Sequence, residues 1–219
     1  MAVADQARSS GRDASFWCDL DAFRAAHLTT EPFPHAIVPR FIPARAMAEV
    51  ESDFPKVARV GSFPLPSLKY GPAFGAMMDA LRGPEFTAAV EEKFGMSLAG
   101  RPTMVTVRGQ SSARDGHIHT DSVTKLITVL IYMNSKWESS EGRLRLVRSS
   151  DNLDDVIAEV PPDEGTLLIF KNAPNAWHGY RPFHGVRRVI QLNWVTSNSV
   201  VRWEQSRHRI SALLKSLRG

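Results

Sequence analysis

The chain has 219 residues, enough for one sizeable hydrophobic core or for one core with a helical flank. Hydrophobic residues make up 43% and charged residues 23%, which is ordinary globular composition. The single cysteine, Cys18, excludes an intramolecular disulfide, and no segment reaches the roughly 20 apolar residues that span a bilayer. The N-terminus has no apolar run typical of a signal peptide, so we expect a cytoplasmic protein. The net charge of +4 comes from scattered basic residues, which favours a solvated surface over a nucleic-acid partner.

The first half of the chain reads as a helical flank with one short strand. Residues 1–15 are small and polar, which predicts disorder. Residues 34–42 predict a strand broken by Pro39, and Pro43 suits the first turn of a helix that Pro55 ends. A loop over 56–70 follows. Phe63 and two prolines cluster in the segment 56–72, where a substrate loop and a plain connection are both open. Two helices are then predicted, over residues 73–82 and 85–94, each ending at a glycine in a left-handed cap.

From about residue 102 to 196 the chain predicts strands. Many short apolar or β-branched runs with turns between them favour a β-sandwich or barrel over a parallel sheet. The predicted strands cover residues 104–109, 117–121, 124–134, 143–147, 156–160, 165–170 and 187–195. Apolar residues at helical spacing over 201–217 then predict an amphipathic C-terminal helix, packed on the barrel or on a second copy of the chain. We therefore expect one domain over 1–219, with a helical flank at 16–101 and a β core at 102–196.

The triplet His119-Thr120-Asp121 carries the strongest chemical signal. Side chains two apart on a strand point the same way, so an imidazole and a carboxylate lie side by side. One further histidine completes a set of two nitrogens and one oxygen, which leaves half of an octahedron open on iron(II). His178 and His184 both follow a predicted strand and are candidates for that third ligand. The neighbouring His117 shares the predicted face and is left unassigned.

Two further residues are candidates for binding an anion near such a metal. On the strand 187–195, alternation places Arg188 with Ile190, Leu192 and Trp194, and a buried arginine needs an anionic partner. The alternative is an arginine at the strand edge in solvent. On the strand 124–134, Tyr132 shares a face with Leu130, and its hydroxyl needs a polar partner. That partner is either the same anion or the protein backbone.

Together these residues resemble the 2-oxoglutarate and iron(II)-dependent dioxygenase superfamily, and most of all its prolyl-hydroxylase-like branch. The resemblance covers about residues 102–196: the triplet at 119–121, the strand end Ile131-Tyr132-Met133-Asn134, the strand from Glu141-Gly142, a histidine, and an arginine ten residues later. Arg188 lies ten residues beyond His178 but only four beyond His184, so the pattern favours His178. Glu141 stands where the family often has a second glycine.

The resemblance implies a mainly β fold, a double-stranded β-helix or jelly roll, packed by N-terminal helices and a C-terminal helix. It implies iron(II) held by His119, Asp121 and His178, and 2-oxoglutarate bound at its distal carboxylate by Arg188 and Tyr132. O2 would then convert 2-oxoglutarate to succinate and CO2 while the substrate is oxidised, usually by hydroxylation. The resemblance admits ascorbate as a reductant, and it favours an amino-acid, peptidyl or other small-molecule substrate.

Three other interpretations compete with the enzyme. A non-catalytic jelly-roll module with a structural metal stays open, although all five motif residues are present. A cupin would need a glutamate shortly after His117-Ile118-His119, and none follows at that spacing. A nucleic-acid demethylase of the same superfamily would carry a longer arginine motif than Arg187 to Trp194 provides.

Overall fold

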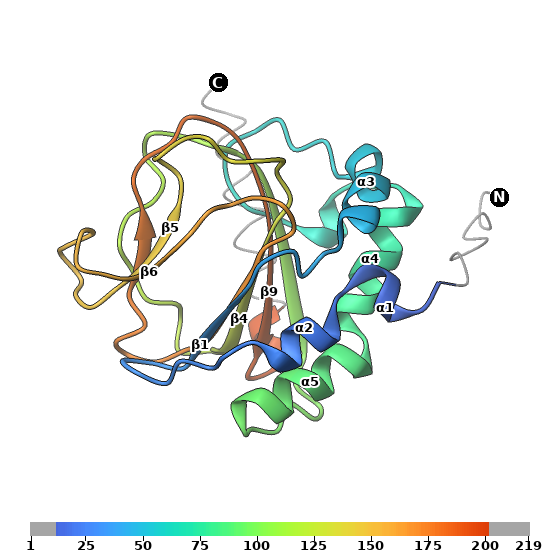
Figure 1. Ribbon diagram of the computed structural model, residues 1–219, viewed down its shortest axis with the longest axis horizontal. Coiled ribbons are helices and arrows are strands. Elements are labelled where there is room, and N and C mark those ends of the chain that lie inside the picture. The colour runs from blue at the N-terminus through green and yellow to red at the C-terminus, as the bar shows by residue number, and fades with distance from the viewer. Residues whose placement is uncertain (1–11, 202–219) are drawn as a thin grey trace.

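The computed structural model describes residues 12–201, which fold into three layers. Helices α1 to α5 cover one face of a large antiparallel sheet, and a small sheet lies against its other face (Figure 1). The helices span Ala14–Trp17 (α1), Leu20–Ala25 (α2), Ala44–Asp53 (α3), Pro72–Arg82 (α4) and Pro84–Phe94 (α5). Within the described residues, no helix combines the length and the apolar character that crossing a membrane requires. The mainly β architecture with helices on its outside confirms the predicted fold class.

The large sheet has six strands in the order β1-β7-β4-β9-β3-β2. Their bounds are His35–Val38 (β1), Phe63–Pro64 (β2), Thr103–Ser111 (β3), Lys125–Tyr132 (β4), Leu167–Lys171 (β7) and Gly185–Val195 (β9). Neighbouring strands are antiparallel throughout, and β3 and β4 flank β9. Strand β1, which lies within the predicted helical flank, is therefore an edge strand of this sheet.

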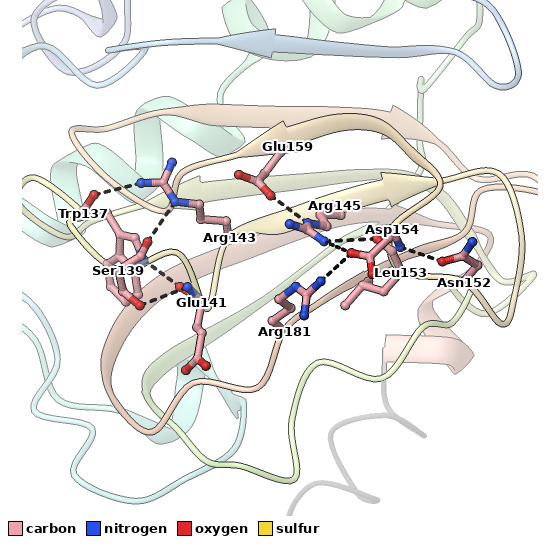
Figure 2. Close-up of polar contacts among 10 residues, drawn as sticks. All are labelled: Trp137, Ser139, Glu141, Arg143, Arg145, Asn152, Leu153, Asp154, Glu159 and Arg181. Carbon is pink, nitrogen blue, oxygen red and sulfur yellow. Dashed lines mark hydrogen bonds and ion pairs between the residues drawn. The ribbon is translucent and has the colours of Figure 1, made fainter.

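The small sheet has the order β6-β5-β8, with strands at Leu144–Val147 (β5), Val156–Val160 (β6) and His178–Tyr180 (β8). An ion-pair cluster holds the β5–β6 loop against it: Arg145 contacts Glu159 at 2.7 Å and Asp154 at 2.6 Å, and Arg181 contacts Asp154 at 2.6 Å (Figure 2). Asp154 lies in the β5–β6 loop and Arg181 just beyond β8. The cluster therefore links the two outer strands of the small sheet, β6 and β8.

Two apolar cores explain why the sheets and helices stack in this order. Between the helices and the large sheet, aromatic and aliphatic side chains such as Phe74, Phe86 and Trp194 are almost completely buried. A second core, including Tyr132, Leu146 and Phe170, fills the space between the two sheets. Because alternate residues of a strand face opposite sides, each central strand contributes to both cores.

The structure corrects several local predictions. Helix α1 begins at Ala14, where the Asp13 carboxylate caps its first turn, so disorder up to residue 15 was wrong for residues 12–15. Gly83 adopts an extended conformation (φ −72°) between α4 and α5, whereas Gly95 has the predicted left-handed one (φ 59°). The predicted C-terminal helix, and any dimer contact through it, fall almost wholly on residues 202–219, outside the described residues.

A register shift at the start of β4 changes which side chain faces the second core. The pairing of β4 with β9 is irregular between Lys125 and Ile127. As a result Lys125 lies on the same side as Thr128, while Leu126 packs toward the helices. Such bulges re-aim side chains next to functional sites. Simple alternation, counted back from Tyr132 and Leu130, would place Leu126 on the cavity face instead of Lys125.

Candidate active site

His119 and His178 lie opposite each other on two segments that meet at the edge of the small sheet. Residues 117–121 are not the predicted strand, but an isolated antiparallel bridge joins His119 to His178. The backbone N–H of each donates to the carbonyl of the other, at 3.0 and 2.9 Å, and the two imidazole centroids are 4.4 Å apart. The two segments can come this close because residue 179 is a glycine. A Cβ atom at this position would stand 2.8 Å from the Gly116 carbonyl oxygen, which is too close. Only glycine fits there.

The orientation of both imidazoles leaves one nitrogen of each free for a ligand. Nδ1 of His119 lies 2.9 Å from the carbonyl oxygen of His117, and Nδ1 of His178 lies 3.0 Å from that of Ala176. A carbonyl oxygen only accepts, so each Nδ1 carries the proton and each Nε2 presents a lone pair. Ligand atoms of His119, Asp121 and His178 all lie within 4.8 Å of one another. Two imidazole nitrogens and one carboxylate oxygen are a donor set that suits iron(II) with open positions.

The Asp121 carboxylate is held by two groups from β4. Lys125 forms an ion pair with its Oδ1 at 2.5 Å, and the Thr128 hydroxyl donates to its Oδ2. The Asn193 amide in turn donates to the Thr128 oxygen at 2.8 Å, which orients that hydroxyl. Burial opposes the charge of Asp121, but Lys125, His178 and these hydrogen bonds outweigh it, so its pKa lies below the usual value. The carboxylate is therefore ionised and fixed in direction, as a metal ligand must be.

His178 is kept neutral by its surroundings. Burial lowers its pKa from 6.5 to about 4, and the neighbouring His119 acts in the same direction, while Asp121 opposes the shift. Phe170 packs beside the ring at a centroid distance of 5.0 Å. Since only neutral imidazole binds a metal, the site keeps this ligand in its binding form over the physiological pH range.

The three metal-ligand candidates line a cavity of about 250 Å³ between the two sheets. Tyr132 reaches it from β4, and its hydroxyl is completely buried without a hydrogen-bond partner. Burial raises the pKa of Tyr132 to about 12, although the charge of Arg187 acts against the shift. An uncharged, unpartnered hydroxyl inside a polar cavity is costly unless a ligand accepts from it. Tyr132 therefore lines the same cavity as the three metal-ligand candidates.

Arg187, and not Arg188, shares this cavity. Strand β9 turns Arg187, Val189 and Gln191 toward the second core, whereas Ile190 belongs to the core under the helices. Arg188 lies on the helix side, with its guanidinium 5.4 Å from the centroid of the Phe54 ring. The predicted face of Arg188 was therefore wrong. Alternation within β9 was read correctly, but the apolar face with Ile190, Leu192 and Trp194 packs under the helices, and the more polar face with Gln191 and Asn193 meets the cavity side.

The guanidinium of Arg187 is fixed on three sides. The side chain is only 3% exposed, and its Nε donates to the carbonyl oxygen of Gly142 at 2.9 Å. Its carbon lies 4.2 Å from the centroid of the Tyr180 ring and 5.5 Å from that of Tyr132. These contacts use one N–H of the guanidinium and place its full positive charge beside Tyr132.

The remaining sequence candidates lie outside the cavity. His184 is exposed and is no part of the histidine–aspartate cluster, and His117 contributes only its backbone carbonyl. From the loop over 56–72, Ser62 does line the cavity. The sequence did not predict Lys125 and Arg108 as cavity residues. The Lys125 side chain reaches the cavity only because of the register shift beside it. Arg108 lies in a strand that was predicted from its apolar residues alone.

A known protein family matches the β core of the chain. The family described as "2OG-Fe(II) oxygenase superfamily" matches residues 107–196, which include all three metal-ligand candidates together with Tyr132 and Arg187. These residues are a 2OG-Fe(II) oxygenase domain. The cofactor of this oxygenase is iron(II), and its cosubstrates are 2-oxoglutarate and O2. No curated protein matches the chain.

Solved structures share the fold of this oxygenase at low sequence identity. A prolyl hydroxylase from Trichoplax adhaerens, in complex with a hypoxia inducible factor peptide fragment, is 17% identical with a TM-score of 0.53, covering 88% of this chain and 91% of its own. HygX from Streptomyces hygroscopicus with iron bound is 12% identical with a TM-score of 0.52, covering 75% and 83%. A collagen prolyl hydroxylase of Paramecium Bursaria Chlorella virus-1, as a 2OG complex, is 12% identical with a TM-score of 0.51, covering 74% and 96%. These neighbours confirm the predicted jelly-roll fold.

Proposed function

We propose that His119, Asp121 and His178 hold the iron(II) of this dioxygenase, and that Arg187 and Tyr132 bind the distal carboxylate of 2-oxoglutarate. The observation that carries the proposal is the shared cavity: three converging ligand atoms, a buried arginine and a buried, unpartnered tyrosine hydroxyl line one space. Arg187 replaces Arg188 in this role because, of these two neighbours, only Arg187 lines that space. Its distance from His178 is nine residues, one fewer than the resemblance suggested.

The chain's own residues bind and orient the reactants. Arg187 and Tyr132 give a carboxylate one charged and one neutral donor, and the aromatic rings around Arg187 exclude water from that pair. The bridge between His119 and His178 fixes two imidazoles, and Thr128 fixes Asp121. Iron(II), when bound, supplies the activation of O2 that converts 2-oxoglutarate to succinate and CO2 and oxidises the substrate.

Lys125 and Thr128 hold the two oxygens of the Asp121 carboxylate, Lys125 at Oδ1 and Thr128 at Oδ2. A divalent ion on Asp121 would repel the Lys125 ammonium group at such short range, whereas the Thr128 hydroxyl could stay. We infer that Lys125 would turn away from Oδ1 when Asp121 holds iron(II).

The substrate proposal is a hydroxylation of an amino-acid, peptidyl or other small molecule. The prolyl hydroxylase from Trichoplax adhaerens is in complex with a peptide fragment, which supports a peptidyl or related substrate for a cavity of the same fold. The competing proposal, a non-catalytic metal module, has the same ligands but no need of the second half of the cavity. The Arg187–Tyr132 pair, buried beside the ligands with a free hydroxyl, favours the enzyme.

Release of succinate from 2-oxoglutarate tests this function before any substrate is known. The protein with iron(II), 2-oxoglutarate and O2 should release succinate slowly, and the Asp121→Ala variant, which lacks the carboxylate ligand, should release none above background. A metal module would release none in either protein. Equal release by wild type and Asp121→Ala would show that the activity does not come from this site.

A further inference from the structure

The cavity contains a second arginine that the iron and 2-oxoglutarate do not use. Arg108 projects into it from β3, on the side of the sheet edge that β2 forms. In the register of the large sheet, Arg108 pairs with Val189, and Val189 pairs with Tyr132. Two strand spacings, about 9–10 Å, therefore separate the backbones of Arg108 and Tyr132. Arg108 and Tyr132 therefore enter the cavity from strands on opposite sides of β9, which gives Arg108 its own part of the cavity wall.

The contacts of Arg108 leave its guanidinium with donors to spare. One terminal nitrogen, Nη1, forms an ion pair with an Asp115 oxygen at 2.9 Å. The other terminal nitrogen reaches the Ser62 hydroxyl only at 3.4 Å. The five N–H groups of the guanidinium are thus engaged by one ion pair and one long contact.

Asp115 is already engaged by its own loop, which limits what it gives Arg108. The same carboxylate oxygen accepts from the backbone N–H of Ser112 at 2.8 Å and from the Ser112 and Ser111 hydroxyls at 3.2 and 3.4 Å. Asp115 does not itself line the cavity, whereas Arg108 does. The carboxylate stays with the loop, and the guanidinium reaches past it into the cavity.

The cavity wall around Arg108 is polar, and the proposed function assigns no role to the residues that form it. Ser62 comes from the loop before β2, and Thr106 and Gln191 pair directly across β3 and β9. These three uncharged side chains offer hydroxyl and amide groups next to one guanidinium. Such a combination suits a small polar ligand with one negative charge.

We propose that Arg108, assisted by Ser62, binds a free carboxylate of the primary substrate. The proposal deepens the proposed function and rests on it. A guanidinium binds a planar carboxylate through two parallel N–H groups, and the donors that Asp115 leaves unused have that geometry. The substrate is then a free acid, such as an amino acid or the C-terminal end of a peptide. An amide bond in the middle of a chain would not supply the charge.

The competing explanation is that Arg108 only anchors the loop 111–118 through Asp115. The two explanations differ in what happens when Asp115 loses its charge. If Arg108 is an anion site, Asp115 competes with the ligand, and Asp115→Asn strengthens carboxylate binding. If Arg108 is an anchor, Asp115→Asn loosens the loop and creates no ligand site.

The test uses acetate as the probe and the metal-free full chain, with the arginine Nε–Hε resonances followed by NMR. We expect acetate, but not acetamide or sodium chloride at equal ionic strength, to shift the Arg108 and Arg187 resonances saturably. Arg188, outside the cavity, is the internal control and should not respond. The Asp115→Asn variant should bind acetate at Arg108 roughly two- to fivefold more tightly, as expected for removal of a partly exposed ion pair.

The Arg187→Gln and Arg108→Gln variants separate this proposal from the proposed function. With Arg187→Gln, acetate should still shift Arg108; with Arg108→Gln, it should still shift Arg187. An Arg108 resonance that ignores acetate in the wild type and in Asp115→Asn, or that responds equally to chloride, overturns the carboxylate site. An Arg187 resonance that ignores acetate speaks against the 2-oxoglutarate site and leaves the Arg108 result intact.

Discussion

Arg187 and Arg188 are neighbours in the chain but lie on opposite faces of β9. Arg187 is buried in the metal cavity beside Tyr132, and Arg188 sits over Phe54 on the helix side. The matched pair allows a clean comparison, since both substitutions remove one positive charge from one strand.

Arg187→Gln should weaken 2-oxoglutarate binding by roughly 10- to 100-fold, the range expected for one charge-assisted hydrogen-bonding group. Arg188→Gln should leave it unchanged, because the group that anchors Arg188 to Asn134 is its backbone N–H. Calorimetric titration of each variant with 2-oxoglutarate, in the presence of manganese(II), measures the effect. If only Arg188→Gln weakened 2-oxoglutarate binding, Arg188 and not Arg187 would be the residue that binds the distal carboxylate.

Removing the Tyr132 hydroxyl should have opposite effects on stability and on binding. Because the hydroxyl is buried without a partner in the free protein, Tyr132→Phe should raise the free energy of unfolding by about 1 kcal/mol. The same change should make the binding of 2-oxoglutarate weaker by about 1.5–3 kcal/mol, the contribution of a hydrogen bond to a charged group. Denaturant unfolding and ligand titration measure the two. A loss of stability with unchanged affinity would make Tyr132 a core residue bonded elsewhere.

Gly142 should support the 2-oxoglutarate site through its carbonyl group. Its φ is +75°, and a Cβ there would stand 2.9 Å from the Trp137 ring and 3.0 Å from Cβ of Phe183. Gly142→Ala should therefore cost roughly 1–3 kcal/mol of stability and move the carbonyl that accepts from Arg187, weakening 2-oxoglutarate. Gly100→Ala is the control, since it has a similar φ of +68° but nothing within 4 Å. Equal effects on 2-oxoglutarate affinity would show that the strained φ, and not the link to Arg187, matters.

The lowered pKa of His178 predicts a specific pH dependence for the metal-free protein. Its pKa is about 4 in the folded state against 6.5 ordinarily, so below pH 6.5 the unfolded chain binds a proton that the folded one does not. The free energy of unfolding should therefore fall as the pH drops from about 6.5 to about 4, by on the order of 1–3 kcal/mol. His178→Gln should flatten this part of the profile in chemical unfolding experiments. A profile unchanged by the substitution would mean that His178 is solvated.

The triplet at 119–121 could be singled out from the sequence because its signal is local: His119 and Asp121 are two residues apart. The choice of His178 over His184 came from the resemblance to the family, and the structure brings His178 together with the triplet. The predictions that failed concern residues whose position relative to the cavity depends on tertiary structure. Arg187 and Arg188 differ only in which face of β9 meets the metal, and Lys125 enters the cavity only because the register shifts beside it.

The helices and most strands could also be predicted, since apolar spacing marks them. The bridge at 117–121 could not, because it is held by two backbone hydrogen bonds to a distant segment and by glycines that allow close approach. Short elements such as α1, β2 and β8 lack the length for a periodic pattern and form through their neighbours.

The most direct test of the central claim is an anaerobic titration of the protein with iron(II) and 2-oxoglutarate, followed by the weak visible charge-transfer band of the chelate. We expect the band in the wild type and in His184→Ala, and its loss in His178→Ala, because only His178 joins His119 and Asp121 in the cavity. A band that survives His178→Ala and disappears in His184→Ala, or no iron binding by the wild type, would contradict the assigned site.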